Sequence, residues 1–184
     1  MELVLLHGFD GASANLLGVA DAVRHQVPSI SVRLLTGPVR LPSGRFAWWN
    51  DGDERYGTPR AALGWLTSRL GPGPVVVAGF SQGGALALAA AFAQIPSVRG
   101  VGCVGGFLPD DTPVGATSAQ LFVAHGEADD AVDVFHAQSL ARQAKRAGLN
   151  HELFIHDGGH LWTDEVTAAF APWLDVLVGS SSSC

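Results

Sequence analysis

Residues 75–84, Val-Val-Val-Ala-Gly-Phe-Ser-Gln-Gly-Gly, decide the fold of this chain of 184 residues. The first half of the stretch is an apolar, β-branched run, which is typical of a buried strand. The second half contains Gly-x-Ser-x-Gly and opens into a segment of small residues that favours a helix. In this context the glycines allow a sharp turn that lifts the hydroxyl of Ser81 above the edge of a sheet. The pattern predicts a nucleophilic serine, and the alternative is an ordinary glycine-rich turn.

Apolar runs alternate with segments of helical spacing on both sides of this stretch. Such alternation is typical of a parallel sheet flanked by helices. We expect strands at residues 3–6, 31–35, 74–78, 100–104, 120–124 and 151–155. We expect helices over residues 13–27, 58–70, 84–93 and 132–147, and a last helix from residue 163. The sequence therefore predicts an α/β fold, with a compact and mostly parallel sheet of six strands, helices on both faces and no large lid.

The chain is expected to form one domain over residues 1–179, followed by a disordered polar tail at residues 180–184. Residues 107–119 contain prolines and glycines but no helical periodicity, so we expect a loop to lead into the fifth strand. Hydrophobic residues make up 47% of the chain and charged residues only 15%, which is enough apolar material for one core.

A net charge of -6 argues against a nucleic-acid partner, because no basic surface is available to neutralise phosphates. The chain has no apolar run of the roughly 20 residues that a membrane span requires. Its first residues do not resemble a signal peptide, and its two cysteines do not indicate a disulfide framework. We therefore expect a cytoplasmic protein without a membrane span, and the sequence leaves the oligomeric state open.

A serine hydroxyl is a poor nucleophile until a base takes its proton, so a histidine and a carboxylate should follow Ser81 in the chain. His160 follows two glycines just beyond the last expected strand, where a loop can bring an imidazole over the turn at Ser81. His156, at the end of that strand, is the alternative base. The preceding strand ends in a segment that contains Asp129 and Asp130, and either can supply the carboxylate. The other aspartate is then expected to cap the next helix.

The developing negative charge on a substrate oxygen requires two backbone N–H donors. One is expected to be the amide of Gln82, which follows the nucleophile. The other is expected in the loop after the first strand, Leu6-His7-Gly8-Phe9-Asp10-Gly11, with the amide of Phe9 as the donor.

The sequence resembles the phospholipase/carboxylesterase family of α/β-hydrolases, which includes bacterial carboxylesterases and acyl-protein thioesterases. The resemblance rests on motifs spread over nearly the whole chain: Leu6-His7-Gly8-Phe9, Arg45-Phe46-Ala47-Trp48-Trp49-Asn50, Gly79-Phe80-Ser81-Gln82-Gly83-Gly84, Gly106-Phe107-Leu108-Pro109, His125-Gly126-Glu127-Ala128-Asp129 and Gly158-Gly159-His160. It implies a catalytic triad of Ser81, Asp129 and His160, and it favours Asp129 over Asp130. It also implies that the amides of Phe9 and Gln82 form the oxyanion hole.

The resemblance further implies a serine carboxylesterase that acts on a small-molecule acyl ester without a cofactor or a metal. Only residues 51–57 separate the tryptophan motif from the next helix, where relatives carry longer substrate-lining segments, so we expect an open site for short acyl groups. Six residues are candidates for lining it: Phe46, Trp48, Trp49, Phe107, Leu161 and Trp162. Three alternatives remain: a thioesterase or lysophospholipase of the same family, a non-catalytic ligand-binding domain, and a metal hydrolase built on His125 and Asp129. The last is disfavoured because the chain has no His-Glu-x-x-His pattern.

Overall fold

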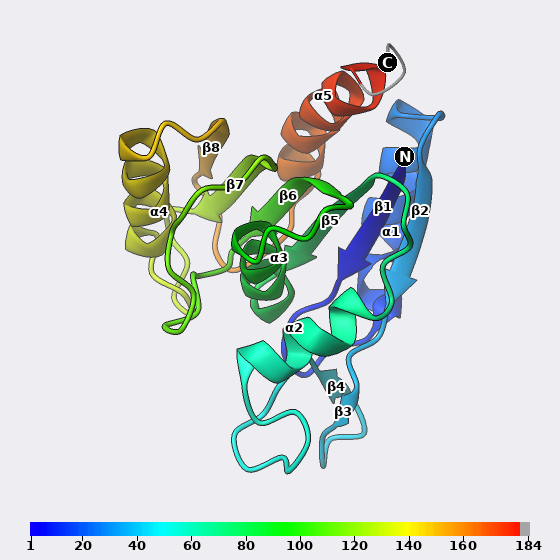
Figure 1. Ribbon diagram of the computed structural model, residues 1–184, viewed down its shortest axis with the longest axis vertical. Helices are drawn as coiled ribbons and strands as arrows, with labels where there is room; N and C mark the ends of the chain where they lie inside the picture. The colour runs from blue at the N-terminus through cyan, green and yellow to red at the C-terminus, as the bar shows by residue number, and fades with distance from the viewer. Residues whose placement is uncertain (181–184) are drawn as a thin grey trace.

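The computed structural model describes residues 1–180, and within them lies one six-stranded parallel sheet (Figure 1). Its strand order is β2-β1-β5-β6-β7-β8, so the strand that precedes Ser81 lies near the centre. The strands are β1 (Glu2–Leu6), β2 (Ser31–Leu35), β5 (Val75–Phe80), β6 (Val98–Val104), β7 (Gln120–Gly126) and β8 (His151–His156). All six expected strands are present, and the predicted α/β class is confirmed.

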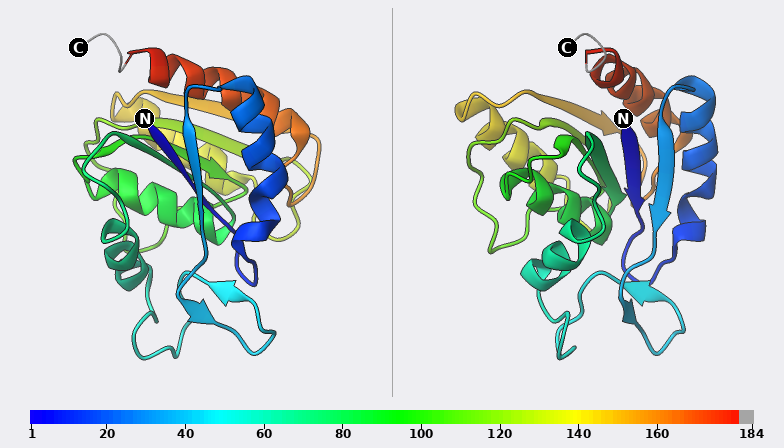
Figure 2. Two further views of the ribbon diagram at one scale, coloured as in Figure 1. Left: turned by 90° about the vertical axis from the view of Figure 1, so that its right-hand side faces the viewer. Right: turned by 45° about the vertical axis from the view of Figure 1, so that its right-hand side comes forward.

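Helices cover both faces of the sheet (Figure 2). They are α1 (Leu17–Gln26), α2 (Pro59–Thr67), α3 (Gln82–Phe92), α4 (Phe135–Arg146) and α5 (Asp164–Ser180), and a 3-10 turn over Ser13–Leu16 precedes α1. The expected cap of α2 is present, because the Thr58 hydroxyl accepts a hydrogen bond from the Ala61 amide at 3.3 Å. No helix within residues 1–180 is long and apolar enough to cross a membrane.

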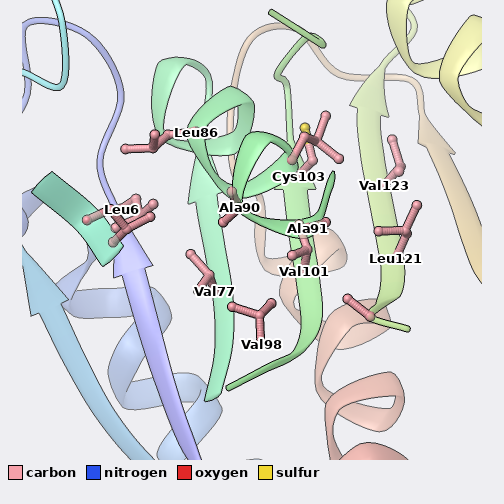
Figure 3. Packing of buried hydrophobic residues seen from close by; sticks show 14 of the residues in the cluster. Leu6, Val77, Leu86, Ala90, Ala91, Val98, Val101, Cys103, Leu121 and Val123 are labelled. Carbon is pink, nitrogen blue, oxygen red and sulfur yellow. The ribbon is translucent and has the colours of Figure 1, made fainter. Parts of the chain in front are cut away.

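Successive side chains of a strand point to opposite faces of the sheet, so they pack in two hydrophobic layers. On β1, Leu3 and Leu5 pack in the layer of α1 and α5, whereas Val4 and Leu6 pack in the layer of α2, α3 and α4. The second layer, in which buried Cys103 lies, is drawn in Figure 3. The sheet is therefore a rigid, two-sided core that holds the ends of its strands in place.

Two features differ in detail from the expectations. Helix α5 extends to Ser180, the first residue of the expected tail, and residues 181–184 lie outside the described part of the chain. An unexpected antiparallel hairpin pairs β3 (Val39–Arg40) with β4 (Phe46–Ala47). These strands are too short to leave a periodic pattern.

The loop expected before β7 is confirmed, since residues 105–119 contain no helix.

The glycines around Ser81 allow α3 to approach β1 more closely than any side chain would permit. A Cβ atom at Gly83 would lie 2.3 Å from the carbonyl oxygen of Leu6 and 2.5 Å from that of His7. A Cβ atom at Gly79 would lie 2.3 Å from the carbonyl carbon of Gly83. Both glycines therefore serve backbone contact between α3 and the neighbouring strands, and this contact sets the position of Ser81.

Gly83→Ala is expected to destabilise the fold by about 2 kcal/mol or more, because the added methyl group forces the backbone of α3 away from β1. The free energy of unfolding in urea measures the effect. Gly64→Ala is the matched control, because Gly64 is exposed within α2 and a Cβ there meets no atom within 4 Å. Alanine at this helical position should be neutral or stabilise by up to about 1 kcal/mol. Equal stability of Gly83→Ala and wild type would contradict the role assigned to the contact.

Candidate active site

Ser81 occupies a strained backbone conformation between β5 and α3. Its φ is 53° and its ψ is -118°, a combination that costs a non-glycine residue about 1–3 kcal/mol. Backbone hydrogen bonds hold the conformation on both sides. The Ser81 amide donates to the Val104 carbonyl at 2.8 Å, and the Ser81 carbonyl accepts from the Ala85 amide at 3.0 Å. The side chain is thus presented at the amino end of α3, where the helix dipole favours negative charge.

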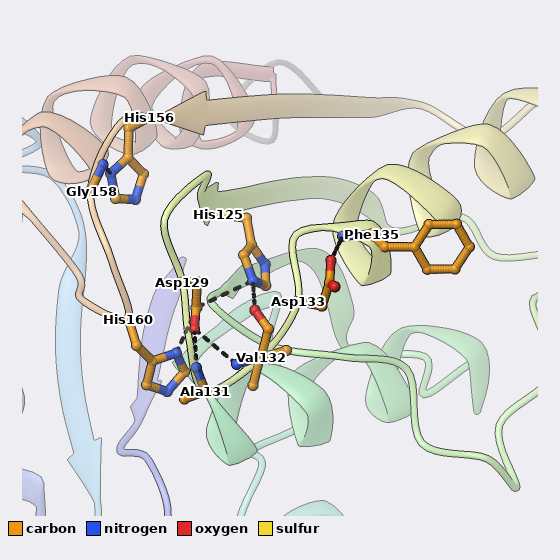
Figure 4. A network of polar contacts seen from close by, with 9 residues as sticks. All are labelled: His125, Asp129, Ala131, Val132, Asp133, Phe135, His156, Gly158 and His160. Carbon is orange, nitrogen blue, oxygen red and sulfur yellow. Dashed lines mark hydrogen bonds and ion pairs between the residues drawn. The ribbon is translucent and has the colours of Figure 1, made fainter.

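Asp129 and His160 form a hydrogen-bonded pair at the carboxyl ends of β7 and β8 (Figure 4). The distance from His160 Nδ1 to Asp129 Oδ2 is 2.7 Å, and the Asp129 side chain is fully buried. The second carboxylate oxygen, Oδ1, accepts from the amides of Ala131 at 2.9 Å and Val132 at 2.8 Å. Because Nδ1 of His160 is held by Asp129, Nε2 remains as the nitrogen that can accept a proton.

The environment of Asp129 keeps its carboxylate ionised. Burial alone would raise the pKa of Asp129, but the hydrogen bonds from Val132, His160 and Ala131 and the charge of His160 outweigh it and lower this pKa below its ordinary value. Asp129 is therefore an anion over the neutral pH range and can stabilise a positive charge on the imidazole.

The ring of His160 lies beside the turn that carries Ser81. It packs on the ring of Phe80, the residue before Ser81, with 4.6 Å between ring centroids. It also lies against Gly105, where a Cβ atom would be 3.4 Å from His160 Nδ1. The His160 side chain remains 21% exposed, so it can meet a ligand from solvent. Within residues 1–180 the Ser81 hydroxyl makes no hydrogen bond.

The alternative acid and base are placed elsewhere. Asp130 is exposed, and it does not cap α4 as expected, because Asp133 instead accepts the amide of Phe135 at 2.8 Å. His156 is buried at the end of β8, and its Nδ1 accepts the amide of Gly158 at 3.1 Å. Figure 4 shows the ring of His156 apart from the pair formed by Asp129 and His160.

The loop after β1 lies against Ser81, and His7 fixes one of its peptide groups. A Cβ atom at Gly8 would be 3.4 Å from the Cβ of Ser81. The buried ring of His7 accepts the Gly37 amide at Nε2, at 2.9 Å, and therefore donates from Nδ1 to the Gly8 carbonyl at 2.6 Å. That carbonyl and the Phe9 amide belong to one planar trans peptide, so fixing one fixes the opposite direction of the other. Burial lowers the pKa of His7, and the bond to Gly8 opposes this only in part, which favours the neutral ring.

The β3–β4 hairpin holds the other end of the same loop. Gly11 exchanges two backbone hydrogen bonds with Phe46, at 3.1 and 2.9 Å. Arg45 donates to the carbonyl of Asp10 at 3.2 Å, and Ser43 donates to the Asp10 side chain. The loop that contains Phe9 is therefore anchored on both sides, by side chains and strands that the sequence pattern did not reveal.

The side chain of Gln82 fastens the tryptophan motif to the start of α3. Its Oε1 accepts the amide of Trp48 at 2.9 Å, and its Nε2 donates to the carbonyl of Trp49 at 2.8 Å. Trp48 is fully buried, and its indole donates to the carbonyl of His7 at 2.7 Å. The prediction that Trp48 lines the substrate site is therefore wrong, because its ring fills the core beneath the loop of His7.

Two clefts lie near the Ser81 turn among the described residues, and neither lining includes Ser81 itself. One has a volume of about 340 Å³ and includes Phe9, Phe80, Leu161 and Trp162 in its wall. The other has a volume of about 450 Å³ and is lined in part by Trp49, Phe107 and His136. Four of the six predicted lining residues thus face a cleft. Phe46 is on β4 and lies outside both linings.

A further hollow, of about 230 Å³, lies between α2, α3 and the loop around Asp111, apart from Ser81. No group of three side chains that could hold a metal ion occurs within residues 1–180.

Gln82→Ala is expected to destabilise the protein by about 2–4 kcal/mol, because a buried amide and a carbonyl lose their partners together. Gln82→Glu is also expected to destabilise, since a carboxylate can accept from Trp48 but cannot donate to Trp49. Gln143→Ala, on the exposed side of α4, is the control and should change stability by less than about 0.5 kcal/mol. Thermal or urea unfolding of the three variants measures the difference, and wild-type stability of Gln82→Ala would refute the fastening role.

The model of the phospholipase/carboxylesterase family matches residues 63–171, which include Ser81, Asp129 and His160. In structure the chain is similar to esterase PE8, with a TM-score of 0.82 and 19% identity over 96% of this chain and 92% of that one. It is similar to the Bacillus cereus carboxylesterase, with a TM-score of 0.80 and 21% identity over 95% and 87% of the two chains. It is also similar to Zea mays acyl-protein thioesterase 2, with a TM-score of 0.77 and 23% identity over 96% and 93%.

These structural similarities show a shared fold. A search of curated proteins finds no match to the sequence. The family model covers more than half of the sequence, and this confirms the resemblance that the motifs indicated. The chain belongs to the phospholipase/carboxylesterase family of α/β-hydrolases.

Proposed function

We propose that this hydrolase is a serine carboxylesterase that cleaves short-chain acyl esters through an acyl-enzyme intermediate on Ser81. The observation that carries the proposal is the pair of buried Asp129 and partly exposed His160, joined at 2.7 Å beside the strained turn of Ser81. Family membership supports ester hydrolysis as the general chemistry.

In the proposed mechanism, Nε2 of His160 takes the proton of the Ser81 hydroxyl while the oxygen attacks the ester carbonyl. The amides of Phe9 and Gln82 then stabilise the negative charge on the carbonyl oxygen. The imidazolium gives its proton to the departing alcohol, which leaves an acyl group on Ser81. Water repeats the same steps and releases the acid. Asp129 remains an anion throughout and stabilises the imidazolium.

A fluorophosphonate probe should label the wild-type protein at Ser81 and should not label Ser81→Ala. Asp129→Asn is expected to lower turnover of p-nitrophenyl acetate by up to about 10⁴-fold, because an amide favours the wrong tautomer of His160. Asp130→Asn is the matched control, since Asp130 is exposed, and it should keep near wild-type turnover. Hydrolysis that persists in Ser81→Ala would overturn the mechanism and favour the metal-dependent alternative. A wild-type protein that neither reacts with the probe nor hydrolyses esters would favour the non-catalytic alternative.

The short-chain assignment rests on the limited cover around the site. Residues 51–57 form only a turn between Trp49 and α2, and the two clefts near Ser81 have volumes of about 340 and 450 Å³. Both clefts are open to solvent, so a long acyl chain would leave much of its apolar surface in water.

p-Nitrophenyl acetate and butyrate are therefore expected to exceed the palmitate ester in kcat/KM by at least about tenfold, or 1.4 kcal/mol. The substrates are compared at equal concentration below their micellar range. Hydrolysis of a butyryl thioester, monitored by the release of its thiol, tests the thioesterase alternative in the same experiment. A preference for palmitate or for the thioester would replace the short-chain ester assignment.

A further inference from the structure

His125 lies next to the candidate triad and has no role in the mechanism above. It is on β7, one residue before the end of the strand, and its side chain is fully buried. Its Nε2 is 2.7 Å from the carbonyl oxygen of Val132 and 3.2 Å from Asp129 Oδ2. Its Nδ1 is buried and has no partner within residues 1–180. A buried polar atom without a partner costs free energy, so we expect the contacts of Nε2 to offset the cost of burying Nδ1.

The contacts determine which nitrogen carries the proton. A carbonyl oxygen can only accept, so a distance of 2.7 Å to Val132 requires a proton on Nε2. The same N–H then faces Asp129 Oδ2, which is the oxygen that accepts His160 Nδ1 at 2.7 Å. His125 therefore donates to Val132, and its Nε2 lies beside the carboxylate oxygen that accepts His160.

A closed set of contacts joins His125, Val132 and Asp129 (Figure 4). The carbonyl of Val132 accepts from His125, and the amide of Val132 donates to Asp129 Oδ1 at 2.8 Å. His125 thus lies 3.2 Å from Oδ2 and holds Val132, the residue whose amide donates to Oδ1. The carboxylate cannot rotate without breaking at least one of these hydrogen bonds.

We infer that His125 is a positioning residue, which holds the carboxylate of Asp129 in the orientation that fixes His160. The inference rests on the proposed function, because it concerns how the proposed triad is oriented. A purely structural role would stabilise the loop after β7 without changing the Asp129–His160 pair, so the two roles differ in what a substitution changes at His160.

His125→Asn and His125→Gln form a matched pair of tests. The amide nitrogen of asparagine reaches only to the position of Nδ1, whereas that of glutamine reaches toward Nε2 and keeps a donor to Val132. In His125→Asn, kcat per active site, counted by fluorophosphonate labelling, should fall by about 10- to 100-fold with little change in KM. His125→Gln should recover most of this loss. His25→Asn, on the exposed side of α1, is the control for replacing a histidine.

The second test compares His125→Asn in the wild-type and Asp129→Asn backgrounds. If His125 acts through Asp129, its replacement should have little further effect once Asp129 is an asparagine. Two results would overturn the inference: wild-type kcat in His125→Asn, or an equal loss in both backgrounds.

A third measurement uses the unaltered protein and does not depend on activity or on the folding of a variant. Nitrogen-15 NMR of the histidine rings should show His125 with its proton on Nε2 and His160 with a proton on Nδ1. A neutral ring with its proton on Nδ1 of His125 would refute the inference, because Nε2 could then not donate to Val132. This outcome is distinct from failure of the proposed function, which would appear as hydrolysis that survives Ser81→Ala while the NMR result stands.

Discussion

The backbone contact between the start of α3 and the end of β1 is the constraint on which the site depends. Gly83 lies against the carbonyl groups of Leu6 and His7, where a Cβ atom would come within 2.5 Å of both oxygens. The loop after β1 lies beside Ser81 next to this contact, and the chain reaches α3 through a φ of 53° at Ser81. The cost of that conformation, about 1–3 kcal/mol, is offset by the sheet and the helix packed around it. The core thus supplies the rigidity that the turn requires.

The polar groups beneath the site are held as tightly as the backbone above it. Asp129 accepts hydrogen bonds from Ala131, Val132 and His160 and lies 3.2 Å from His125 Nε2, and Gln82 pairs with both neighbours in the tryptophan motif. These groups are buried, so each unmade bond would cost the full desolvation of a polar atom. Buried hydrogen bonds with few alternatives therefore fix the directions of the side chains and peptides that face Ser81.

Apolar runs and helical periodicity were sufficient to predict the sheet, because its four inner strands are mostly buried, although β2 and β8 at the edges are largely not. The hairpin of β3 and β4 was missed, since two residues per strand leave no period, and it was recognised only through the bonds of Gly11 and Phe46. The pairing of Asp129 with His160 could be expected from motifs, but its geometry depends on contacts across 31 residues of sequence. Trp48 was misplaced because an aromatic residue near a motif looks the same in sequence whether it faces a cleft or the core.

Three histidines near the site show why the protonation of each imidazole ring could not be predicted from the sequence. His7 and His125 both precede a glycine at the end of a strand, yet His7 donates from Nδ1 and His125 from Nε2. The difference arises because Gly37 offers an N–H to one ring and Val132 offers a carbonyl to the other. In His160, Asp129 occupies Nδ1, which leaves Nε2 for a ligand. The chemistry of each imidazole is therefore set by a partner from elsewhere in the chain, and only the folded structure identifies that partner.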